Sequence, residues 1–233
     1  MNASPLISVI LPAYNEALNL QGLLPQLHAV LRPIVSDYEI LVIDRPMPGD
    51  DSVAICSEQG AHYYTANEVG YGSALRMGIG LARGQHILVM DADGSHPVSL
   101  IPALYEAIQH ADMVIASRYV QGGKTHDTQL NIMLSKLLNG MVRLLFVCPI
   151  KDVSSSFRMY DGGKLRGLSL NARHFNIPLE ILFRMQKTYP DCRIVEVPME
   201  FQKRRQGISK RSYVVFARAY ASTLFTLMIE RYL

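Results

Sequence analysis

Two aspartates one residue apart are the clearest sign of chemistry in this chain. Asp91 and Asp93 stand in the segment DADGSHP, directly after four apolar residues. Carboxylate oxygens are preferred ligands of Mg²⁺ and Mn²⁺, which keep further coordination positions for substrate phosphates. The pair therefore indicates a site for a metal ion and a diphosphate. The competing interpretation is structural, because acids and serines also cap helices such as the one expected from about Pro97.

A glycine-rich segment offers a second candidate for phosphate binding. Residues 67–84 read NEVGYGSALRMGIGLARG, and Gly70 and Gly72 precede a helical pattern, where backbone N–H groups can meet an anion. The segment lacks the GxGxxG spacing of a dinucleotide site, because Leu75 stands where the third glycine is needed. For Gly78 and Gly80, close packing between a helix and the sheet is the favoured interpretation.

Alternating strands and helices must position these residues. Short apolar runs alternate with helical patterns through the first half of the chain, which predicts βαβ units in a mostly parallel, doubly wound sheet with helices on both faces. The expected strands are Ile7 to Leu11, Ile40 to Asp44, His62 to Thr65, Ile87 to Met90 and Met113 to Ser117, and the later segments SSFRMY and CRIVEVPMEF are also strand-like. The expected helices are Ala17 to Leu31, Asp51 to Gln59, Gly72 to Arg83, Val98 to His110, Asn131 to Phe146 and Leu179 to Tyr189.

Such a sheet binds its ligands at the carboxyl ends of its strands. The first strand is followed by PAYNE, which contains Glu16, the second ends at Asp44, and the fourth leads into Asp91 and Asp93. We therefore expect these four carboxylates near one edge of the sheet.

Composition and charge exclude several classes of protein. The chain has 233 residues, of which 49% are hydrophobic and 18% charged, so it is not a disordered chain. A net charge of +3 is too small to indicate a partner made of nucleic acid. Three widely spaced cysteines match no disulfide framework or metal motif and indicate reduced thiols in a cytoplasmic setting. The N-terminus lacks the basic region of a signal peptide, and no apolar run reaches the length of a membrane span.

The charge is unevenly distributed along the chain. Residues 1–200 hold 16 basic and 19 acidic side chains, whereas residues 201–233 hold 7 basic and 1 acidic. The segment KRRQGISKR at 203–211 precedes a long apolar pattern with the features of a helix. We expect a domain at 1–211 and an amphipathic helix at 212–233, which either contacts a membrane surface or packs against the body of the protein.

Several of these motifs together resemble inverting glycosyltransferases of family 2. The matching segments in the first half are PAYNE, Asp44, NxxGxGxA with GxxxAxG, MDADGSHP and SRY at 117–119. In the second half, SKxxN at 135–139, DVSSSFRMY at 152–160 and FxxRxxGxSK at 201–210 are similar to the branch that glycosylates polyprenyl or dolichyl phosphates. The resemblance covers most of the chain and implies a GT-A fold and a nucleotide-diphospho-sugar donor.

The resemblance also implies roles for particular residues. Pro12, Tyr14, Glu16 and Asp44 would surround the nucleotide, whereas Asp91 and Asp93 would hold Mg²⁺ or Mn²⁺ with the diphosphate, and Asp93 would assist its departure. The residues that would face phosphate groups of donor or acceptor are Arg118, Ser135, Arg204 and Lys210. Considered without the family, Glu16 is more simply an acid at a helix start and Arg118 a member of a surface ion pair.

The acceptor is indicated by what the chain lacks. Family 2 enzymes that glycosylate a hydroxyl resemble one another in an acidic motif whose carboxylate removes the hydroxyl proton. The comparable stretch here, NIPLEILFRM, contains Glu180 and no adjacent acid. A polyprenyl phosphate is already anionic and needs no such base, so a phosphate acceptor is favoured, with Glu180 kept as an alternative base.

The chain departs from the family pattern after Asp44. Where the family has DDGSxD, this chain reads DRPMPGDD, with Arg45 in the place of an acid. Two alternatives follow: Arg45 pairs with a donor phosphate, or Asp50 supplies the missing acid. In either case the donor identity stays open: GDP-mannose is favoured, with UDP-glucose and UDP-N-acetylglucosamine as alternatives.

Three functions remain at this stage. The favoured one is a membrane-peripheral hexosyltransferase at the cytoplasmic face that uses a polyprenyl phosphate acceptor, an arrangement compatible with a small membrane partner. The second is a family 2 enzyme with a lipid or glycan hydroxyl as acceptor. The third is a nucleotide-sugar-binding protein impaired in catalysis by its altered loop.

Overall fold

A seven-stranded sheet forms the centre of the computed structural model, which describes residues 6–146, 148–203 and 213–232, without the side chains of 213–217, 219, 231 and 232. The strands are β1 (Ile7–Pro12), β2 (Tyr38–Asp44), β3 (His62–Thr65), β4 (His86–Val89), β5 (Met113–Ser117), β7 (Arg158–Asp161) and β8 (Ile194–Pro198). Their order across the sheet is β3-β2-β1-β4-β7-β5-β8. Only β7 runs antiparallel to its neighbours, so the prediction of a mostly parallel, doubly wound sheet is confirmed.

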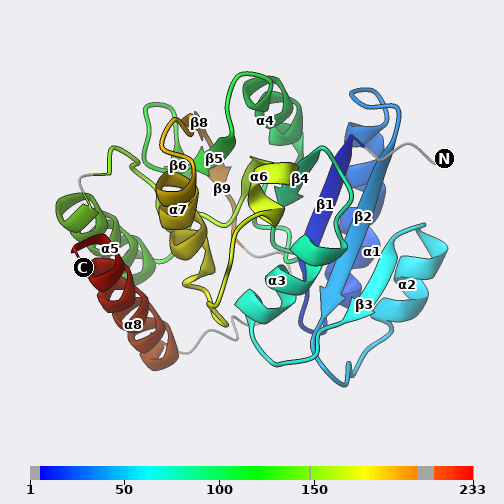
Figure 1. The fold of residues 1–233 in the computed structure, drawn as a ribbon. Coiled ribbons are helices and arrows are strands. Elements are labelled where there is room, and N and C mark those ends of the chain that lie inside the picture. The colour runs from blue at the N-terminus through cyan, green and yellow to red at the C-terminus, as the bar shows by residue number, and fades with distance from the viewer. Residues whose placement is uncertain (1–5, 147, 204–212, 233) are drawn as a thin grey trace.

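The helices cover both faces of this sheet (Figure 1). They are α1 (Ala17–Leu31), α2 (Ser52–Glu58), α3 (Tyr71–Leu81), η1 (Val98–Leu100), α4 (Ile101–Ile108), α5 (Gln129–Phe146), α6 (Gly162–Arg166), α7 (Ile177–Thr188) and α8 (Tyr213–Tyr232). Side chains of α1 and α4 share one core with the sheet, while those of α3, α5, α6, α7 and α8 share the other. The expected helix from Val98 is divided into η1 and α4.

The central strands are apolar because both of their faces are covered. All six residues of β1 and all four of β4 are buried. The two strands pair in parallel with Ile7 opposite His86 and Ile10 opposite Val89, so their carboxyl ends lie side by side. This alignment places the segment after β1 next to the DADGSHP loop, as the sequence predicts.

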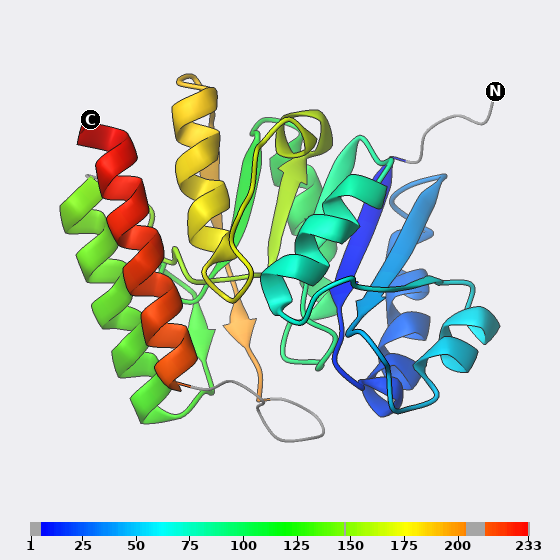
Figure 2. The same cartoon turned by 60° about the horizontal axis from the view of Figure 1, so that its bottom comes forward.

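The C-terminal helix packs against the body of the protein. Tyr220, Leu224 and Leu227 of α8 are buried in the core that also contains α7. Tyr220 donates a hydrogen bond to the carbonyl of Phe175 at 2.7 Å. Figures 1 and 2 both show α8 alongside α5 at the edge of the molecule. The predicted domain boundary at 211 and 212 lies outside the described residues and stays a prediction.

A second, two-stranded sheet joins distant segments near the site. The strand β6 (Lys124–Thr125) pairs in parallel with β9 (Glu200–Phe201). Neither β6 nor the short helix α6 is expected from sequence, because two to five residues carry too little periodicity to be recognised. Through this pairing, Phe201 arrives beside the loop that follows β4, where its ring lies 5.7 Å from that of His96.

Candidate active site

The loop after β4 holds Asp91 in a network of hydroxyl and imidazole groups. Its Oδ1 accepts a hydrogen bond from the hydroxyl of Tyr71 at 2.9 Å, and both carboxylate oxygens lie within 3.3 Å of the Ser156 hydroxyl. The backbone N–H of Asp91 donates to Nδ1 of His96 at 3.0 Å. Burial raises the pKa of the Asp91 carboxyl, and the neighbouring charge of Asp93 adds to this effect. A nearby cation therefore stabilises the ionised form that a metal site requires.

Asp93 shapes the turn that presents both acids. Its Oδ1 accepts hydrogen bonds from the backbone N–H of Ser95 at 2.9 Å and from the Ser95 hydroxyl at 2.6 Å. Gly94 has φ of 76°, a conformation that glycine adopts without strain. The expected cap of the helix near Pro97 is not formed, because the short helix Val98–Leu100 has no side-chain cap, and the hydrogen bonds of Asp93 instead close the turn at Ser95.

The donor set fits a hard divalent cation shared with a substrate. Among the described residues there is no group of three or more Asp, Glu, His and Cys side chains able to hold a metal ion. Mg²⁺ is usually bound through one or two carboxylates together with substrate phosphates, so Asp91 and Asp93 suffice when the diphosphate supplies the other ligands. The pair thus fits a metal shared with a substrate and does not form a structural metal cage by itself.

His96 is a buried, neutral ring that supports this loop. It stacks on Phe157 with ring centroids 4.9 Å apart and is 3% exposed. Burial lowers its pKa, against the opposing effect of Asp91. Because Nδ1 accepts the backbone N–H of Asp91, the imidazole proton lies on Nε2, which is 3.9 Å from the Asp91 carboxylate.

Arg118 faces the same space but is held by a buried partner. Its Nε and Nη2 donate to the two oxygens of Asp152, both at 2.8 Å, and its backbone N–H donates to the same carboxylate. Burial raises the pKa of Asp152, but the hydrogen bonds from Arg118 outweigh it and leave that pKa lowered. Since Asp152 is fully buried, this is an internal ion pair, and the surface pair considered from sequence is excluded.

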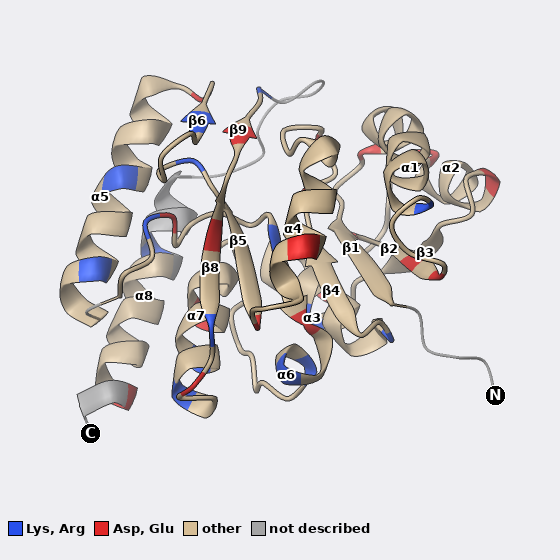
Figure 3. Ribbon diagram, turned by 90° about the horizontal axis from the view of Figure 1, so that it is seen from above, with Lys and Arg blue, Asp and Glu red and all other residues tan. Residues whose placement is uncertain are grey.

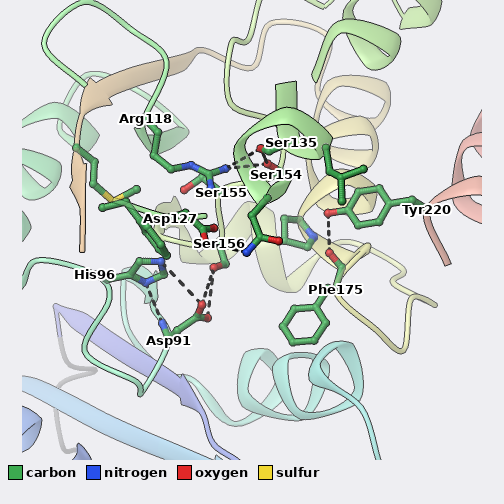
Figure 4. Close-up of a pocket in the computed structure, with 15 residues that line it drawn as sticks. Asp91, His96, Arg118, Asp127, Ser135, Ser154, Ser155, Ser156, Phe175 and Tyr220 are labelled. Atoms are coloured by element: carbon green, nitrogen blue, oxygen red, sulfur yellow. Dashed lines mark hydrogen bonds and ion pairs between the residues drawn. The ribbon is translucent and has the colours of Figure 1, made fainter. Parts of the chain in front are cut away.

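Hydroxyl groups surround the free edge of this guanidinium. Nη2 of Arg118 also donates to Ser154 at 2.9 Å and to Ser135 at 3.2 Å, and the two serine hydroxyls lie 2.9 Å apart. Figure 4 shows these groups on one wall of a pocket and Asp91 with His96 on another. The lining residues are Asp91, His96, Arg118, Asp127, Asn131, Leu134, Ser135, Ser154, Ser155, Ser156, Phe175, Pro178, Met199, Phe201 and Tyr220.

A fully buried arginine fixes the serine-containing wall. Arg158 of β7 donates to the carbonyls of Ser155, Val153 and Pro178 at 2.7 to 2.8 Å. These three bonds fasten the loop before β7 to the start of α7. The antiparallel strand β7, inserted between β4 and β5, thereby carries Ser156 to Asp91 and Ser154 to Arg118.

The residues predicted to surround the nucleotide gather at the ends of β1 and β2. The Asp44 carboxylate is fully buried and accepts hydrogen bonds from the backbone N–H of Arg45 at 2.7 Å and from the Tyr63 hydroxyl at 3.1 Å. Pro12 ends β1, and Tyr14, which is 38% exposed, follows it. Arg45 lies over the Tyr14 ring, 4.6 Å from its centroid.

The two acids beside them have structural contacts. Glu16 directly precedes α1, is 8% exposed, and accepts a hydrogen bond from the side chain of Asn19 at 2.6 Å. Asp50 accepts from the backbone N–H of Ala17 at 2.9 Å and from both the backbone and the hydroxyl of Ser52. Asp50 therefore caps the starts of α1 and α2 and is a poor substitute for the missing acid of the motif.

The glycines at the start of α3 serve packing. A Cβ atom at Gly70 would lie 2.2 Å from the carbonyl oxygen of Arg173, and one at Gly72 would lie 2.4 Å from that of Ala172. The backbone N–H of Gly72 donates to Arg173 at 3.0 Å, so this helix start is occupied by protein. Gly78 packs against β1 as expected, whereas a Cβ at Gly80 would meet no atom within 4 Å, and the packing interpretation fails there.

Glu180 is engaged in a structural network. It is 4% exposed, and its oxygens accept the backbone N–H groups of Asn171 and Ala172 at 2.8 to 3.1 Å. Arg184 lies 3.3 Å away. Glu180 is absent from the pocket lining, so its position does not favour the alternative of a general base.

The structure brings three predicted residues into one pocket, namely Asp91, Arg118 and Ser135. Asp93 lies in the adjoining turn, while Pro12, Tyr14, Glu16 and Asp44 stand at the neighbouring strand ends. Arg204 and Lys210 lie outside the described residues. Sequence reasoning assigned no role to Tyr71, Asp152, Ser154, Ser156 and His96, although all except Tyr71 fall within the motifs DADGSHP and DVSSSFRMY.

Comparisons with known sequences all indicate the same family. The model named glycosyl transferase family 2 matches residues 8–167. A protein named undecaprenyl-phosphate mannosyltransferase from Micrococcus luteus is 32% identical over 218 residues, covering 88% of this chain and 87% of that protein. A dolichol-phosphate mannosyltransferase from Pyrococcus furiosus is 35% identical over 213 residues, covering 88% of this chain; the chain spans 58% of that relative's length.

Solved structures share the fold at low sequence identity. Glucosyl-3-phosphoglycerate synthase from Mycobacterium tuberculosis, in complex with Mn²⁺, UDP and phosphoglyceric acid, superposes with a TM-score of 0.75 at 16% identity, covering 97% of this chain and 78% of that one. The same enzyme with Mg²⁺ and UDP gives a TM-score of 0.72 at 16% identity, covering 97% of this chain and 79% of that one. The likeness supports the GT-A architecture expected from sequence.

Proposed function

The chain belongs to glycosyltransferase family 2, and from that premise we propose that it transfers a hexose, with mannose favoured, from a nucleotide-diphospho-sugar to a polyprenyl phosphate with inversion. One observation carries the proposal beyond the family: a single pocket joins Asp91 to a cluster of phosphate-compatible donors around Arg118. A donor diphosphate and an acceptor phosphate can therefore approach each other from opposite walls.

On the donor side, Asp91 and Asp93 would hold Mg²⁺ or Mn²⁺, which supplies charge neutralisation for the departing nucleotide diphosphate. The protein positions the metal-binding carboxylates beforehand. Tyr71 and Ser156 orient the Asp91 carboxylate, and the Ser95 hydroxyl orients that of Asp93. Fixed donors of this kind need little reorganisation as charge develops on the leaving group.

On the acceptor side, Arg118, Ser135 and Ser154 offer hydrogen bonds to a phosphate. The guanidinium is anchored by Asp152, so its direction toward the pocket is fixed before the acceptor binds. A phosphate monoester is anionic at neutral pH and attacks the anomeric carbon without a general base. The engagement of Glu180 with backbone N–H groups supports this acceptor class over a hydroxyl.

A transfer assay tests the proposal. Purified protein with Mn²⁺ is incubated with labelled GDP- and UDP-sugars and a short polyprenyl phosphate. Label that becomes lipid-soluble supports the proposal, transfer to glycans alone supports a hydroxyl acceptor, and binding without turnover indicates loss of catalysis. Asp93→Asn should abolish turnover with the fold retained, whereas Asp191→Asn, at an exposed acid away from the pocket, should not. Near-normal turnover of Asp93→Asn would refute the metal assignment.

We further propose that the protein is peripheral to the cytoplasmic face of a membrane. No helix in the described part of the chain has the length and hydrophobicity that a bilayer span requires. The outer face of α5 is nevertheless apolar: Leu144 is 81% exposed and Leu137 60%, in a stripe completed by Leu130, Met133 and Met141. The stripe repeats at the spacing of one helix face.

The charges of α5 favour an anionic lipid surface as its partner. Lys136 and Arg143 are exposed, and α5 contains no acidic residue, as Figure 3 shows. The opposite side of the same helix supplies Ser135 to the pocket. A single helix thus separates the proposed phosphate site from the apolar stripe, which brings the pocket close to the surface where a prenyl lipid resides.

Sedimentation with liposomes tests this contact. Leu137→Ser with Leu144→Ser should reduce binding to vesicles that contain phosphatidylglycerol, because both side chains would otherwise enter the acyl boundary. Leu18→Ser is the matched control, since Leu18 is 69% exposed on α1. Equal sedimentation of the two variants, or a concentration-dependent dimer that the double substitution disperses, would contradict the lipid contact. A small membrane partner would appear as binding restored only by native membranes.

A further inference from the structure

Arg45 occupies the place where relatives of this chain are expected to carry an acid, and the fold holds it in a defined position. Its Nη1 donates to the Tyr14 hydroxyl at 2.7 Å, its Nε donates to the carbonyl of Pro46 at 3.1 Å, and its guanidinium lies over the Tyr14 ring. Within the described part of the chain no carboxylate forms an ion pair with it. Arg45 is therefore an oriented cation with donor capacity left over.

The neighbouring acids cannot take its place in binding a ligand. Asp44 is fully buried and accepts from Arg45, Asn15 and Tyr63. Asp50 is bound at the starts of α1 and α2. At the end of β2, the partly exposed Arg45 thus presents a donor of hydrogen bonds where the expected motif would present an acceptor.

The sheet indicates which part of the donor would meet Arg45. The strand β2 is separated from β4 by β1, and adjacent strands lie about 4.8 Å apart, so the backbones of the two strands that lead to Arg45 and Asp91 are about 10 Å apart across the sheet. If the diphosphate is bound at Asp91, the ribose and base extend over this interval. Arg45 then stands on the side of the base, and Asp91 on the side of the metal-bound phosphates.

We propose that Arg45, backed by Tyr14, determines donor specificity by donating hydrogen bonds to the O6 and N7 atoms of guanine. A guanidinium has only donors, and the O6/N7 edge of guanine presents two adjacent acceptors that match its fork. Uracil instead carries an N3–H between its two carbonyl acceptors, and this N–H repels a guanidinium donor. The inference rests on the proposed function, since it identifies the base of the nucleotide-sugar donor.

Calorimetric titration of nucleotides in the presence of Mn²⁺ tests the inference. The wild-type chain should bind GDP more tightly than UDP, and 7-deaza-GDP, which lacks N7, more weakly than GDP. Arg45→Ala should weaken GDP binding about ten- to a hundredfold, the effect of losing a bidentate contact, and change UDP binding little. Arg45→Lys keeps the charge but should also lose the preference for guanine.

Two results would overturn the inference. Equal weakening of GDP and UDP by Arg45→Ala would mean that Arg45 senses the diphosphate, and equal binding of GDP and 7-deaza-GDP by the wild type would exclude contact with N7. Arg32→Ala, at an exposed arginine just after α1, controls for a general loss of positive charge. Arg45→Ala is also tested for transfer of label from GDP- and UDP-sugars to polyprenyl phosphate. If this variant still transfers label with an unchanged preference for the base, the inference about Arg45 is wrong and the proposed function still holds.

Discussion

Replacing Asp152 with Asn tests how the pocket is built. In the wild type, the carboxylate neutralises Arg118 through two 2.8 Å hydrogen bonds and a third from the backbone. The Asp152 side chain is 0% exposed and that of Arg118 11%. The amide keeps the shape of the carboxylate but removes its charge, so Arg118 is left buried without a counterion.

The expected loss of stability is large. Removing one partner of a buried ion pair costs about 3 to 5 kcal/mol, out of about 5 to 15 kcal/mol for a whole domain. With an m-value of about 2.5 kcal/mol/M, the urea midpoint should fall by about 1 to 2 M. Glu200→Gln is the matched control, because its pair with His126 has the same 2.8 Å distance while both side chains are about half exposed. This control should leave the midpoint essentially unchanged.

The pH dependence of the same pair has a defined sign. The folded-state pKa of Asp152 is lowered, because hydrogen bonds from Arg118 outweigh the opposing effect of burial. The contribution of the pair is therefore complete above the unfolded pKa of about 3.9 and is lost as the pH falls through the folded value. The difference in stability between wild type and Asp152→Asn should be constant from pH 8 to 5 and shrink below about pH 4.

A double substitution separates stability from binding. Asp152→Leu combined with Arg118→Met replaces the pair by apolar side chains of similar size and should recover most of the lost stability. The same variant should lose acceptor binding, which appears as a raised KM for polyprenyl phosphate. If Asp152→Asn shifts the urea midpoint no more than Glu200→Gln does, the buried pair is not the anchor of this wall and the reasoning is wrong.

Four further substitutions test other parts of the structure. Gly78→Ala should destabilise the fold by about 1 to 3 kcal/mol, because its Cβ would lie 2.5 Å from a side chain of β1. Gly80→Ala has open space on the same helix and should stabilise the fold by up to about 1 kcal/mol. Urea unfolding of both variants measures the difference. Burial lowers the pKa of His86, so the stability contributed by its neutral form is present above the unfolded pKa of about 6.5 and is lost as the pH falls. His86→Phe should therefore lose less stability than the wild type between pH 7 and 5. An unfolding temperature that depends on pH equally in both proteins would count against this. Tyr71→Phe removes the hydrogen bond to Asp91 and keeps the ring. At saturating Mn²⁺, kcat/KM should fall about tenfold while the unfolding temperature changes little. A wild-type rate would show that the Tyr71 hydroxyl does not orient the Asp91 carboxylate.

The sequence predicts the positions of the parallel strands well because their burial on both faces leaves apolar runs that are visible locally. β1, β2, β3 and β5 agree with the predicted runs to within about two residues at either end, and the acids that follow them meet at one edge. The insertion of β7 between β4 and β5 was not predicted, since strand order depends on contacts between segments about 70 residues apart in the chain. The same long-range insertion explains why Ser156 was not recognised as a partner of Asp91.

Arg118 illustrates a limit of motif reasoning at the level of a single residue. The motif identifies a cation that faces a phosphate, and the structure shows that its charge is already balanced by Asp152. The pocket is lined by Arg118 and by the acids Asp91 and Asp127, so the cationic residues of its described lining do not outnumber the acidic ones. A phosphate acceptor and a nucleotide diphosphate together bring several negative charges to this space. Additional positive charge must therefore come from the metal ion and from residues beyond the lining. We therefore expect Arg118 to contribute to acceptor binding mainly by directing hydrogen bonds to the phosphate, because its own charge is already balanced by Asp152.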